Sequence, residues 1–369
     1  MSKKTKNPSF FFSFLNNLTF IALSGIIRYM ENIMNYTREM LENYFVGLGD
    51  KKYKATQIME WIYQKHEYNF DNFSNVSKKQ IECLKHDFNI EFIKLVKVLE
   101  GPLVKKFLFE LSDNEHIEAV LMEHDYGLSV CVSSQVGCNM GCAFCESGRR
   151  KKVRNLNTFE MVQQIILIED YIKKRISSVV IMGIGEPFDN YDNVINFIKI
   201  INDDKSLAIG ARHITVSTCG LVPKIKEFSN LDLQVNLAIS LHAATDELRN
   251  KLMPVNKVYS LDVLMPCLKE YIAKTNRRIT IEYVMLNMIN DRETDAEALV
   301  KLIKGMNAYV NLIPYNETTH IEFKKSNKSR IDKFYQILKK NNINVTVRRE
   351  FGTDIKAACG QLRSESENI

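Results

Sequence analysis

The chain has 369 residues, 45% of them hydrophobic and 25% charged, with a formal net charge of +6 and a pI near 8.7. This length and composition exclude a small disulfide-rich scaffold and a largely disordered chain, and they predict one sizeable domain with a smaller one. The eight cysteines are too sparse for a secreted disulfide framework, which favours a reducing compartment and a cytoplasmic protein. The modest positive charge tolerates a polyanionic partner without requiring one.

Residues 1–33 differ in character from the rest. Lysines near the start are followed by an uncharged run from Asn7 to Ile27, which has the shape of a signal peptide or a marginal membrane anchor. Polar residues interrupt this run at Ser9, Ser13, Asn16, Asn17 and Thr19. We therefore expect a dispensable extension, with translation starting at Met34 as one explanation, and no stable membrane partner.

Residues 34–95 have helical periodicity. Apolar residues recur every three or four positions in "NYTREMLENYFVGLG" and "KATQIMEWIYQK", which predicts a small accessory domain of two or three helices. Residues 96–125 then alternate as a β-hairpin with a turn at Ser112 to Glu115, and we expect this hairpin to link two domains. Alternation alone would place Glu118 on the solvent-facing side of the hairpin.

Residues 126–369 alternate between short apolar strands and helical stretches. Strand-like segments include "SSVVIMGIGEP", "RHITVSTCG", "LQVNLAISLHAA", "RRITIEYVML" and "AYVNLIPYN", separated by segments such as "TFEMVQQIILIEDYIKK" and "SLDVLMPCLKEYIAK". This pattern predicts an α/β fold, a partial (β/α) TIM-like barrel. Polar residues at the strand ends would face the catalytic mouth of such a barrel; they are Glu186, Ser217, His242 and Asn316.

Three cysteines lie together in "VGCNMGCAFCESG", at Cys138, Cys142 and Cys145. Thiolates bind zinc, copper and iron-sulfur clusters. A structural zinc site needs four protein ligands, so a distant fourth residue would have to complete it. Three close thiolates fit a cubane cluster in which each binds one iron and the remaining iron is open to a small molecule. The spacing thus predicts a metal centre and leaves zinc as the alternative.

The C-x3-C-x2-C spacing, with Phe144 before the last cysteine, resembles the radical S-adenosylmethionine (SAM) superfamily. "MGIGEP", which contains Gly185 and Glu186, is similar to the glycine-acid motif that receives the methionyl amino group in that superfamily. The resemblance implies a 4Fe-4S cluster held by the three cysteines, and SAM bound at its open iron.

A closer resemblance covers the chain from Met34 to Leu362. "CVSSQVGC", "RNL", "GEP", "LAISLHA", "LMPVN", "IEYVML", "VNLIPYN" and "DIKAACGQL" are similar to motifs of the RlmN/Cfr family of radical SAM RNA (adenine) methyltransferases. This implies methylation of an adenine ring carbon in RNA, with C2 of 23S ribosomal RNA favoured and transfer RNA possible. A C8 methyltransferase of the Cfr type is the alternative within the family.

The same resemblance implies roles for particular residues. Cys359 would carry the methyl group as S-methylcysteine, Cys131 would resolve the intermediate through a transient disulfide with Cys359, and Glu118 would accept the ring proton. Two SAM molecules would be used per turnover, with an electron donor such as flavodoxin or ferredoxin, by a monomeric enzyme. The implied cofactor contacts are Gly185, Glu186, Ser217, Ser240, Leu241, His242 and Asn316. The remaining cysteines match no motif and are interpreted as packing residues; they are Cys83, Cys219 and Cys267.

The sequence departs from the family pattern after the cysteines. Residues 149–154 contain five basic side chains, and Lys151 stands where the family often has its second glycine. This basic loop is either a solvated surface loop or a lip that grips RNA phosphates, which would alter the RNA target. The resemblance also implies that residues 34–95 help to hold structured RNA. Two classes outside the family stay open: a radical SAM enzyme with a non-RNA substrate, and a zinc-stabilised RNA-binding protein.

Overall fold

The computed structural model describes residues 30–318, 320–348 and 360–362. Most of the N-terminal extension and the predicted methyl carrier Cys359 lie outside these residues, so the predictions for them are not addressed by the structure. No helix within the described ranges is both long and apolar enough to cross a membrane.

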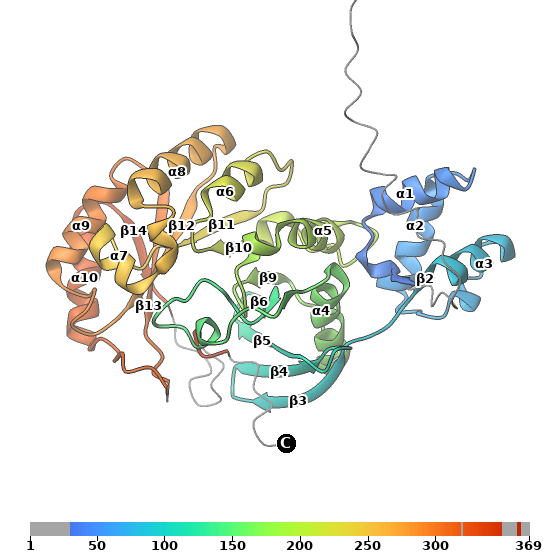
Figure 1. Ribbon diagram of the computed structural model, residues 1–369, viewed down its shortest axis with the longest axis horizontal. Helices are drawn as coiled ribbons and strands as arrows, with labels where there is room; N and C mark the ends of the chain where they lie inside the picture. Colours follow the sequence, from blue (N-terminus) through green and yellow to red (C-terminus); the bar gives the residue numbers. More distant parts are fainter. Residues whose placement is uncertain (1–29, 319, 349–359, 363–369) are drawn as a thin grey trace, which may run out of the picture.

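A ten-stranded sheet organises the larger part of the chain (Figure 1). From β6 to β14 neighbouring strands pair in parallel, which confirms the predicted partial (β/α) barrel. Its parallel strands are β6 (Gly127–Val132), β9 (Ser178–Ile181), β10 (Ile214–Thr218), β11 (Asn236–Ser240), β12 (Ile279–Met285), β13 (Ala308–Pro314) and β14 (Asn344–Val347).

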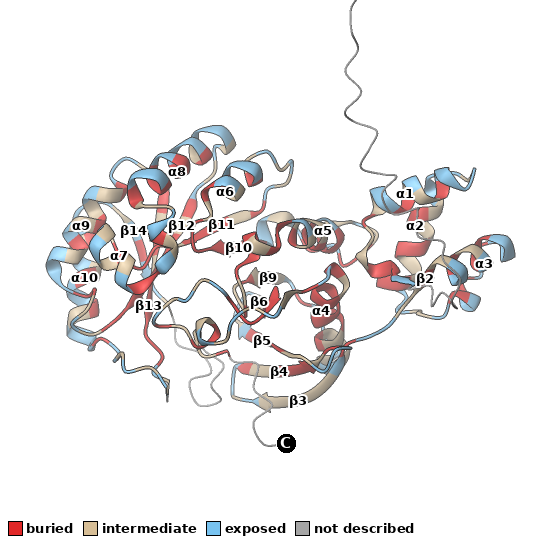
Figure 2. Cartoon of the chain, in the orientation of Figure 1, coloured by how far each residue is buried: buried red, intermediate tan, exposed pale blue. Residues whose placement is uncertain are grey.

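Helices cover the outer face of this sheet. They are α4 (Thr158–Ile172), α5 (Tyr191–Asn202), α6 (Val222–Phe228), α7 (Asp246–Leu252), α8 (Leu261–Thr275), α9 (Glu293–Ile303) and α10 (Lys328–Lys340). Figure 2 shows buried residues along the strands and exposed residues on the outward sides of the helices. The strands are rich in β-branched residues, and Val179, Val216 and Ile281 are fully buried, because parallel strands under helices contact apolar side chains on their covered face.

The predicted hairpin extends the barrel sheet. β4 (Val104–Glu110) and β5 (His116–His124) form it, and the turn falls where the sequence predicts. β5 also pairs antiparallel with β6, while β3 (Lys94–Glu100) adds an edge strand to β4. Residues 96–125 therefore extend the sheet of the barrel.

The register of the hairpin gives it two buried faces. Val120 lies opposite Cys131, and because side chains alternate along a strand, Glu118 shares their face. Phe107, Ile117 and Val130 point to the other face and belong to the main core. The expectation that Glu118 faces solvent is wrong, because this residue is only 5% exposed.

The N-terminal helices form a small unit that packs on the barrel (Figure 1). The backbone amide of Phe159 in α4 donates to Asn35 Oδ1 at 2.9 Å, and Arg38 pairs with Asp203 at 2.8 Å. The elements of this N-terminal unit are β1 (Glu31–Asn32), the 3-10 turn Ile33–Asn35, α1 (Arg38–Gly47), α2 (Tyr53–Met59), the π turn Glu60–Gln64, the 3-10 turn Phe70–Asn72, α3 (Lys78–Asp87) and β2 (Phe88–Asn89).

Short elements complete the loops between the strands and helices of the barrel. They are β7 (Gln135–Val136), β8 (Arg154–Asn155) and the 3-10 turns Glu146–Arg149, Pro187–Asn190, Ala211–His213 and Pro254–Lys257.

Candidate active site

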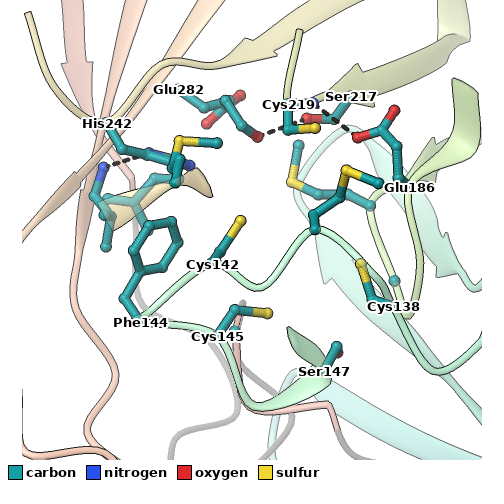
Figure 3. A pocket seen from close by; sticks show the side chains of 18 of the residues that line it. Cys138, Cys142, Phe144, Cys145, Ser147, Glu186, Ser217, Cys219, His242 and Glu282 are labelled. Atoms are coloured by element: carbon teal, nitrogen blue, oxygen red, sulfur yellow. Dashed lines mark hydrogen bonds between the residues drawn. The ribbon is translucent and has the colours of Figure 1, made fainter. Parts of the chain in front are cut away.

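A pocket opens at the carboxyl ends of the parallel strands (Figure 3). This is where α/β barrels bind ligands. All three clustered cysteines line it, together with six of the seven predicted cofactor contacts: Gly185, Glu186, Ser217, Ser240, His242 and Asn316.

Leu241 is the exception. Its side chain is fully buried in the main core rather than in the lining of the pocket. Any contribution from this residue would come from its backbone, whose amide already donates to the Glu282 carbonyl at 3.1 Å.

The three cysteines project from the loop that follows β7. The loop is held by backbone contacts: the Cys138 amide donates to the Arg150 carbonyl at 2.9 Å, and the Ala143 amide donates to the Leu252 carbonyl at 2.9 Å. Within the described chain, no three His, Cys, Asp or Glu side chains gather tightly enough to hold a single metal ion. The thiols instead surround one side of the pocket (Figure 3), which fits a cubane that takes one thiolate at each of three irons.

Burial is the largest influence on the pKa values of two of these thiols. It raises the pKa of Cys138 to about 12 and the pKa of Cys142 well above its usual value. Because metals bind thiolates, assembly of a cluster here must release protons from these side chains. The donor set of three thiols beside an open pocket therefore suits an iron-sulfur cluster with one iron open to a ligand.

Glu186 is fixed in the wall of the pocket by backbone amides. Its Oε1 accepts from the Phe188 amide at 3.0 Å and its Oε2 from the Cys219 amide at 2.8 Å. Its own amide donates to Gln135 Oε1 at 2.9 Å. Burial raises the pKa of this carboxyl, and a cationic group such as the ammonium of an amino acid would compensate its charge when bound. The carboxylate thus suits the methionyl amino group of SAM.

His242 contributes a neutral imidazole. Its Nδ1 accepts a hydrogen bond from the Val284 amide at 3.0 Å, which leaves the ring proton on Nε2. Burial, followed by the charge of Arg249, lowers its pKa to about 3. Its backbone is left-handed, with φ of 57°, and its ring meets that of Phe144 edge-on at 4.8 Å. A non-glycine residue in this conformation is characteristic of functional sites.

Two other pocket residues were given no role in the sequence analysis, although one of them, Glu282, lies in the motif "IEYVML". Cys219, interpreted as a packing residue, is buried but also lines the pocket. Glu282 lines it as well; Asn311 Nδ2 donates to its Oε2 at 2.8 Å, and burial raises its pKa. A lone acid inside the apolar strand "RRITIEYVML" was the available signal for Glu282. Cys267 packs in the core as predicted, and Cys83 is half-buried in α3.

Glu118 and Cys131 lie on the barrel-facing side of the hairpin strands. Glu118 pairs with Lys106 Nζ at 2.8 Å. Cys131 is 7% exposed and belongs to a small apolar cluster that also contains Leu362.

The described C-terminal residues 360–362 dock beside the cysteine loop. The Gly360 carbonyl accepts from the Glu146 amide at 2.9 Å, and the Leu362 carbonyl accepts from Ser147 Oγ at 2.8 Å. Gly360 also lines the pocket. Because Gly360 directly follows Cys359 in the sequence, the chain next to the predicted methyl carrier reaches the predicted cluster site.

Most of the basic side chains at 149–154 are paired with acids. Arg150 contacts Glu115 at 2.6 Å and Lys152 contacts Asp189 at 2.7 Å. Arg154 binds both Asp113 and Glu160, at 2.6 and 2.8 Å, and this contact lowers the pKa of Asp113. The loop is thus neither simply solvated nor an open set of cations.

Comparison with known proteins first defines the class. The family model "Radical SAM superfamily" matches residues 132–300, and this superfamily assignment confirms the predicted 4Fe-4S cluster and SAM as cofactors. A crystal structure of a radical SAM methyltransferase from Sphaerobacter thermophilus is similar at 37% identity with a TM-score of 0.84, over 91% of this chain and 100% of that one.

The particular family follows from closer relatives. The model "Ribosomal RNA large subunit methyltransferase N-terminal domain" matches residues 31–90. The "Probable dual-specificity RNA methyltransferase RlmN" of Enterococcus faecalis is 52% identical over 344 residues, which cover 91% of this chain and 96% of that protein. The protein of the same name from Spiroplasma citri is 52% identical over 92% of this chain and 99% of its own. The chain belongs to the RlmN family of radical SAM RNA methyltransferases.

Proposed function

We propose that this protein methylates C2 of an adenine in RNA, by way of a methyl group carried on Cys359. Large-subunit ribosomal RNA is the favoured substrate, since the model that matches residues 31–90 is named for it, and transfer RNA is a second substrate. The observation that carries the proposal is the docking of residues 360–362: Gly360 lines the pocket of the cluster cysteines, and Leu362 packs in the cluster of Cys131.

In this proposal the pocket holds the cofactors. Cys138, Cys142 and Cys145 bind the 4Fe-4S cluster, and Glu186 receives the amino group of SAM. When bound, these cofactors supply the methyl group and a deoxyadenosyl radical. His242 stays neutral, so its Nε2–H is a hydrogen-bond donor without added charge. The apolar walls of the pocket exclude water from reactive species.

In this proposal, side chains of the protein carry the methyl group, accept the proton and release the product. The Cys359 sulfur forms a bond to the methyl group by displacement at the SAM sulfonium and loses its proton. The methyl group on Cys359 would give one hydrogen atom to the deoxyadenosyl radical that the cofactors supply, and its carbon would then bond to the adenine carbon. One electron would leave this adduct for the oxidised cluster, and Glu118 accepts the ring proton. Cys131 then attacks the Cys359 sulfur, the sulfur–carbon bond breaks with its electron pair on the carbon, and that carbon takes up a proton to become the product methyl group while the two sulfurs form a disulfide. Cellular thiols return the two electrons that reduce this disulfide.

The geometry around Glu118 and Cys131 supports these roles. They share one face of the antiparallel pair β5–β6, where diagonal neighbours lie about 7–8 Å apart. A base and a thiol at this spacing can both serve one bound nucleotide. Flavodoxin or ferredoxin is the proposed electron donor, and we expect a monomer that works in the cytoplasm.

Cys131→Ala tests the proposal, because removal of the resolving thiol should leave RNA attached to the protein. The variant would be loaded with its cluster without oxygen and given SAM, reductant and unmodified 23S ribosomal and transfer RNA transcripts. We expect a conjugate at Cys359, located by mass spectrometry of the digested protein and RNA. Cys83→Ala, which changes a half-buried cysteine in α3, should turn over without a conjugate, and Cys131→Ala/Cys359→Ala should form none. If Cys131→Ala loads its cluster and cleaves SAM but forms no conjugate, the proposal is wrong.

A further inference from the structure

Among the described residues, Arg249 in α7 is a buried cation that makes no ion pair with an acid. Its side chain is fully buried, at 0% exposure. Its guanidinium donates to neutral oxygens: to the Cys219 carbonyl at 2.6 Å, to Asn256 Oδ1 at 2.7 Å and to the Leu241 carbonyl at 3.2 Å. No carboxylate of the described residues lies within the 4.0 Å of an ion pair with it. Asp246 is linked to it through the Asn256 amide rather than directly.

This arrangement is unfavourable unless a negative charge is supplied. Buried charges in proteins are normally paired or coordinate a metal, because neutral dipoles replace water only in part. Burial lowers the pKa of Arg249, but a guanidinium remains protonated in proteins. Arg330 of the barrel is partly exposed and makes a two-pronged ion pair with the buried Asp291 at 2.8 Å. Arg249 is more deeply buried, yet it makes no such ion pair with the described residues.

The missing charge lies on the pocket side of Arg249. Its Nη2 holds the carbonyl of Cys219, and the Cys219 side chain lines the pocket with Cys142 (Figure 3). The helix that carries Arg249 also holds the cysteine loop, because the Leu252 carbonyl in α7 accepts from the amide of Ala143, the residue after Cys142, at 2.9 Å. Arg249 thus lies on the helix that supports a predicted cluster ligand. A cluster bound by three thiolates is net negative, and each reduction adds one further negative charge.

We propose that Arg249 is the fixed counter-charge of the iron-sulfur cluster and raises its reduction potential. The inference rests on the cluster of the proposed function and adds a positioning residue outside its ligands. One electron passes from an external reductant to the cluster, the reductant is oxidised, and Arg249 keeps its proton. Because attraction to a cation grows with the negative charge, Arg249 stabilises the reduced cluster more than the oxidised cluster.

A purely structural role makes different predictions. Arg249 also joins three chain segments through the carbonyls of Cys219 and Leu241 and the side chain of Asn256. If that were its whole contribution, neutral and charged replacements would lose stability alike, and any protein that loaded a cluster would keep the wild-type potential.

The test is a redox titration, followed by electron paramagnetic resonance, of cluster-loaded protein without RNA or SAM. For Arg249→Gln and Arg249→Met we expect at least a tenfold shift of the one-electron equilibrium toward the oxidised cluster, which equals 59 mV or more toward negative potential. Arg249→Lys, which keeps the charge, should stay within a few-fold of wild type. Arg330→Gln controls for lost stability, since it breaks an ion pair outside the pocket lining and should leave the potential unchanged.

Each outcome decides the proposal. A wild-type potential in either neutral variant would overturn it, as would an equal shift in Arg249→Lys. If neither neutral variant retains a cluster while Arg249→Lys does, the charge is required for loading and the proposal is supported; loss of the cluster in all three overturns it. The titration contains no RNA, so a failure of RNA methylation would count against the proposed function and leave this result standing.

Discussion

Gly185 is a residue of the glycine-acid motif that tolerates no side chain. Its φ is 108°, which L side chains rarely adopt, and a Cβ built on it would lie 2.6 Å from Gln135 Cβ and 2.9 Å from the Gln135 backbone nitrogen. Gln135 is not free to retreat, because its Oε1 accepts from the Glu186 amide at 2.9 Å and its Nε2 donates to Asp189 Oδ2 at 2.9 Å. Gly185→Ala must therefore displace Gln135, Glu186 or both.

The magnitude follows from two separate penalties. A residue forced into a sparsely populated backbone region costs about 1–3 kcal/mol, and overpacking of a tight site adds about 1–3 kcal/mol. We expect Gly185→Ala to lower the free energy of unfolding by about 2–6 kcal/mol. Because Glu186 is the proposed partner of the SAM amino group, its displacement should weaken SAM binding at least tenfold, or about 1.4 kcal/mol.

Urea unfolding measures the first effect, and calorimetric titration of cluster-loaded protein with SAM measures the second. Gly47→Ala is the matched control: Gly47 is the last residue of α1, and its added Cβ meets nothing within 4 Å. Since alanine favours the helix, this control should gain up to about 1 kcal/mol and bind SAM normally. A Gly185→Ala protein with wild-type stability and SAM affinity would refute the reasoning.

Three further predictions are tested by urea unfolding. Asn290→Ala strips three buried backbone groups of a partner, the His242 carbonyl among them, and should cost about 3–6 kcal/mol. Lys106→Met removes the ammonium paired with Glu118 and should cost about 3–5 kcal/mol, part of it recovered when Glu118→Gln is added. Because burial and then Arg249 hold the pKa of His242 near 3, the unfolded chain alone binds this proton below pH 6.5. Wild-type stability should then fall by about 1.4 kcal/mol per pH unit from this group as pH drops from 6.5 toward 3, and more gently in His242→Asn.

Each of these predictions has a result that contradicts it. Wild-type stability in Asn290→Ala would mean that water replaces the amide. Additive losses in the Lys106→Met/Glu118→Gln pair would mean that the two side chains do not interact. Equal acid slopes for wild type and His242→Asn would mean that His242 is protonated in the folded protein.

The sequence predicts the pocket well because its residues sit at the ends of recognisable strands. Glu186, Ser217, His242 and Asn316 each follow an apolar run, and parallel strands bring their carboxyl ends to one edge of a sheet. All four line the pocket. The cysteine spacing is also a local signal, and it predicts the metal centre. These signals need no knowledge of long-range contacts.

Arg249 could not be predicted in this way. It lies in the polar helical stretch "DELRNKL", where charged residues normally face solvent. Its burial results from contacts with Cys219 and Asn256, which a periodicity cannot reveal. The expectation that Glu118 faces solvent is wrong for a related reason. Alternation identifies two faces of a strand but not that both are covered, and here Lys106 and the apolar neighbours of Cys131 cover the second face.

The ion pairs of the basic loop at residues 149–154 indicate a different role from the RNA contact that its composition suggests. Arg150 and Lys152 each contact a carboxylate at 2.6 to 2.7 Å, so a phosphate would have to replace an existing partner. The same loop supports the cysteines, because the Arg150 carbonyl accepts from the Cys138 amide. The Lys151 carbonyl oxygen also approaches Gly137 so closely that a Cβ at Gly137 would clash with it. Its charges therefore fix the loop to the barrel, and the loop in turn fixes the first cluster ligand. On this argument, reversal of Arg150 or Lys152 should reduce cluster loading more than it reduces RNA binding.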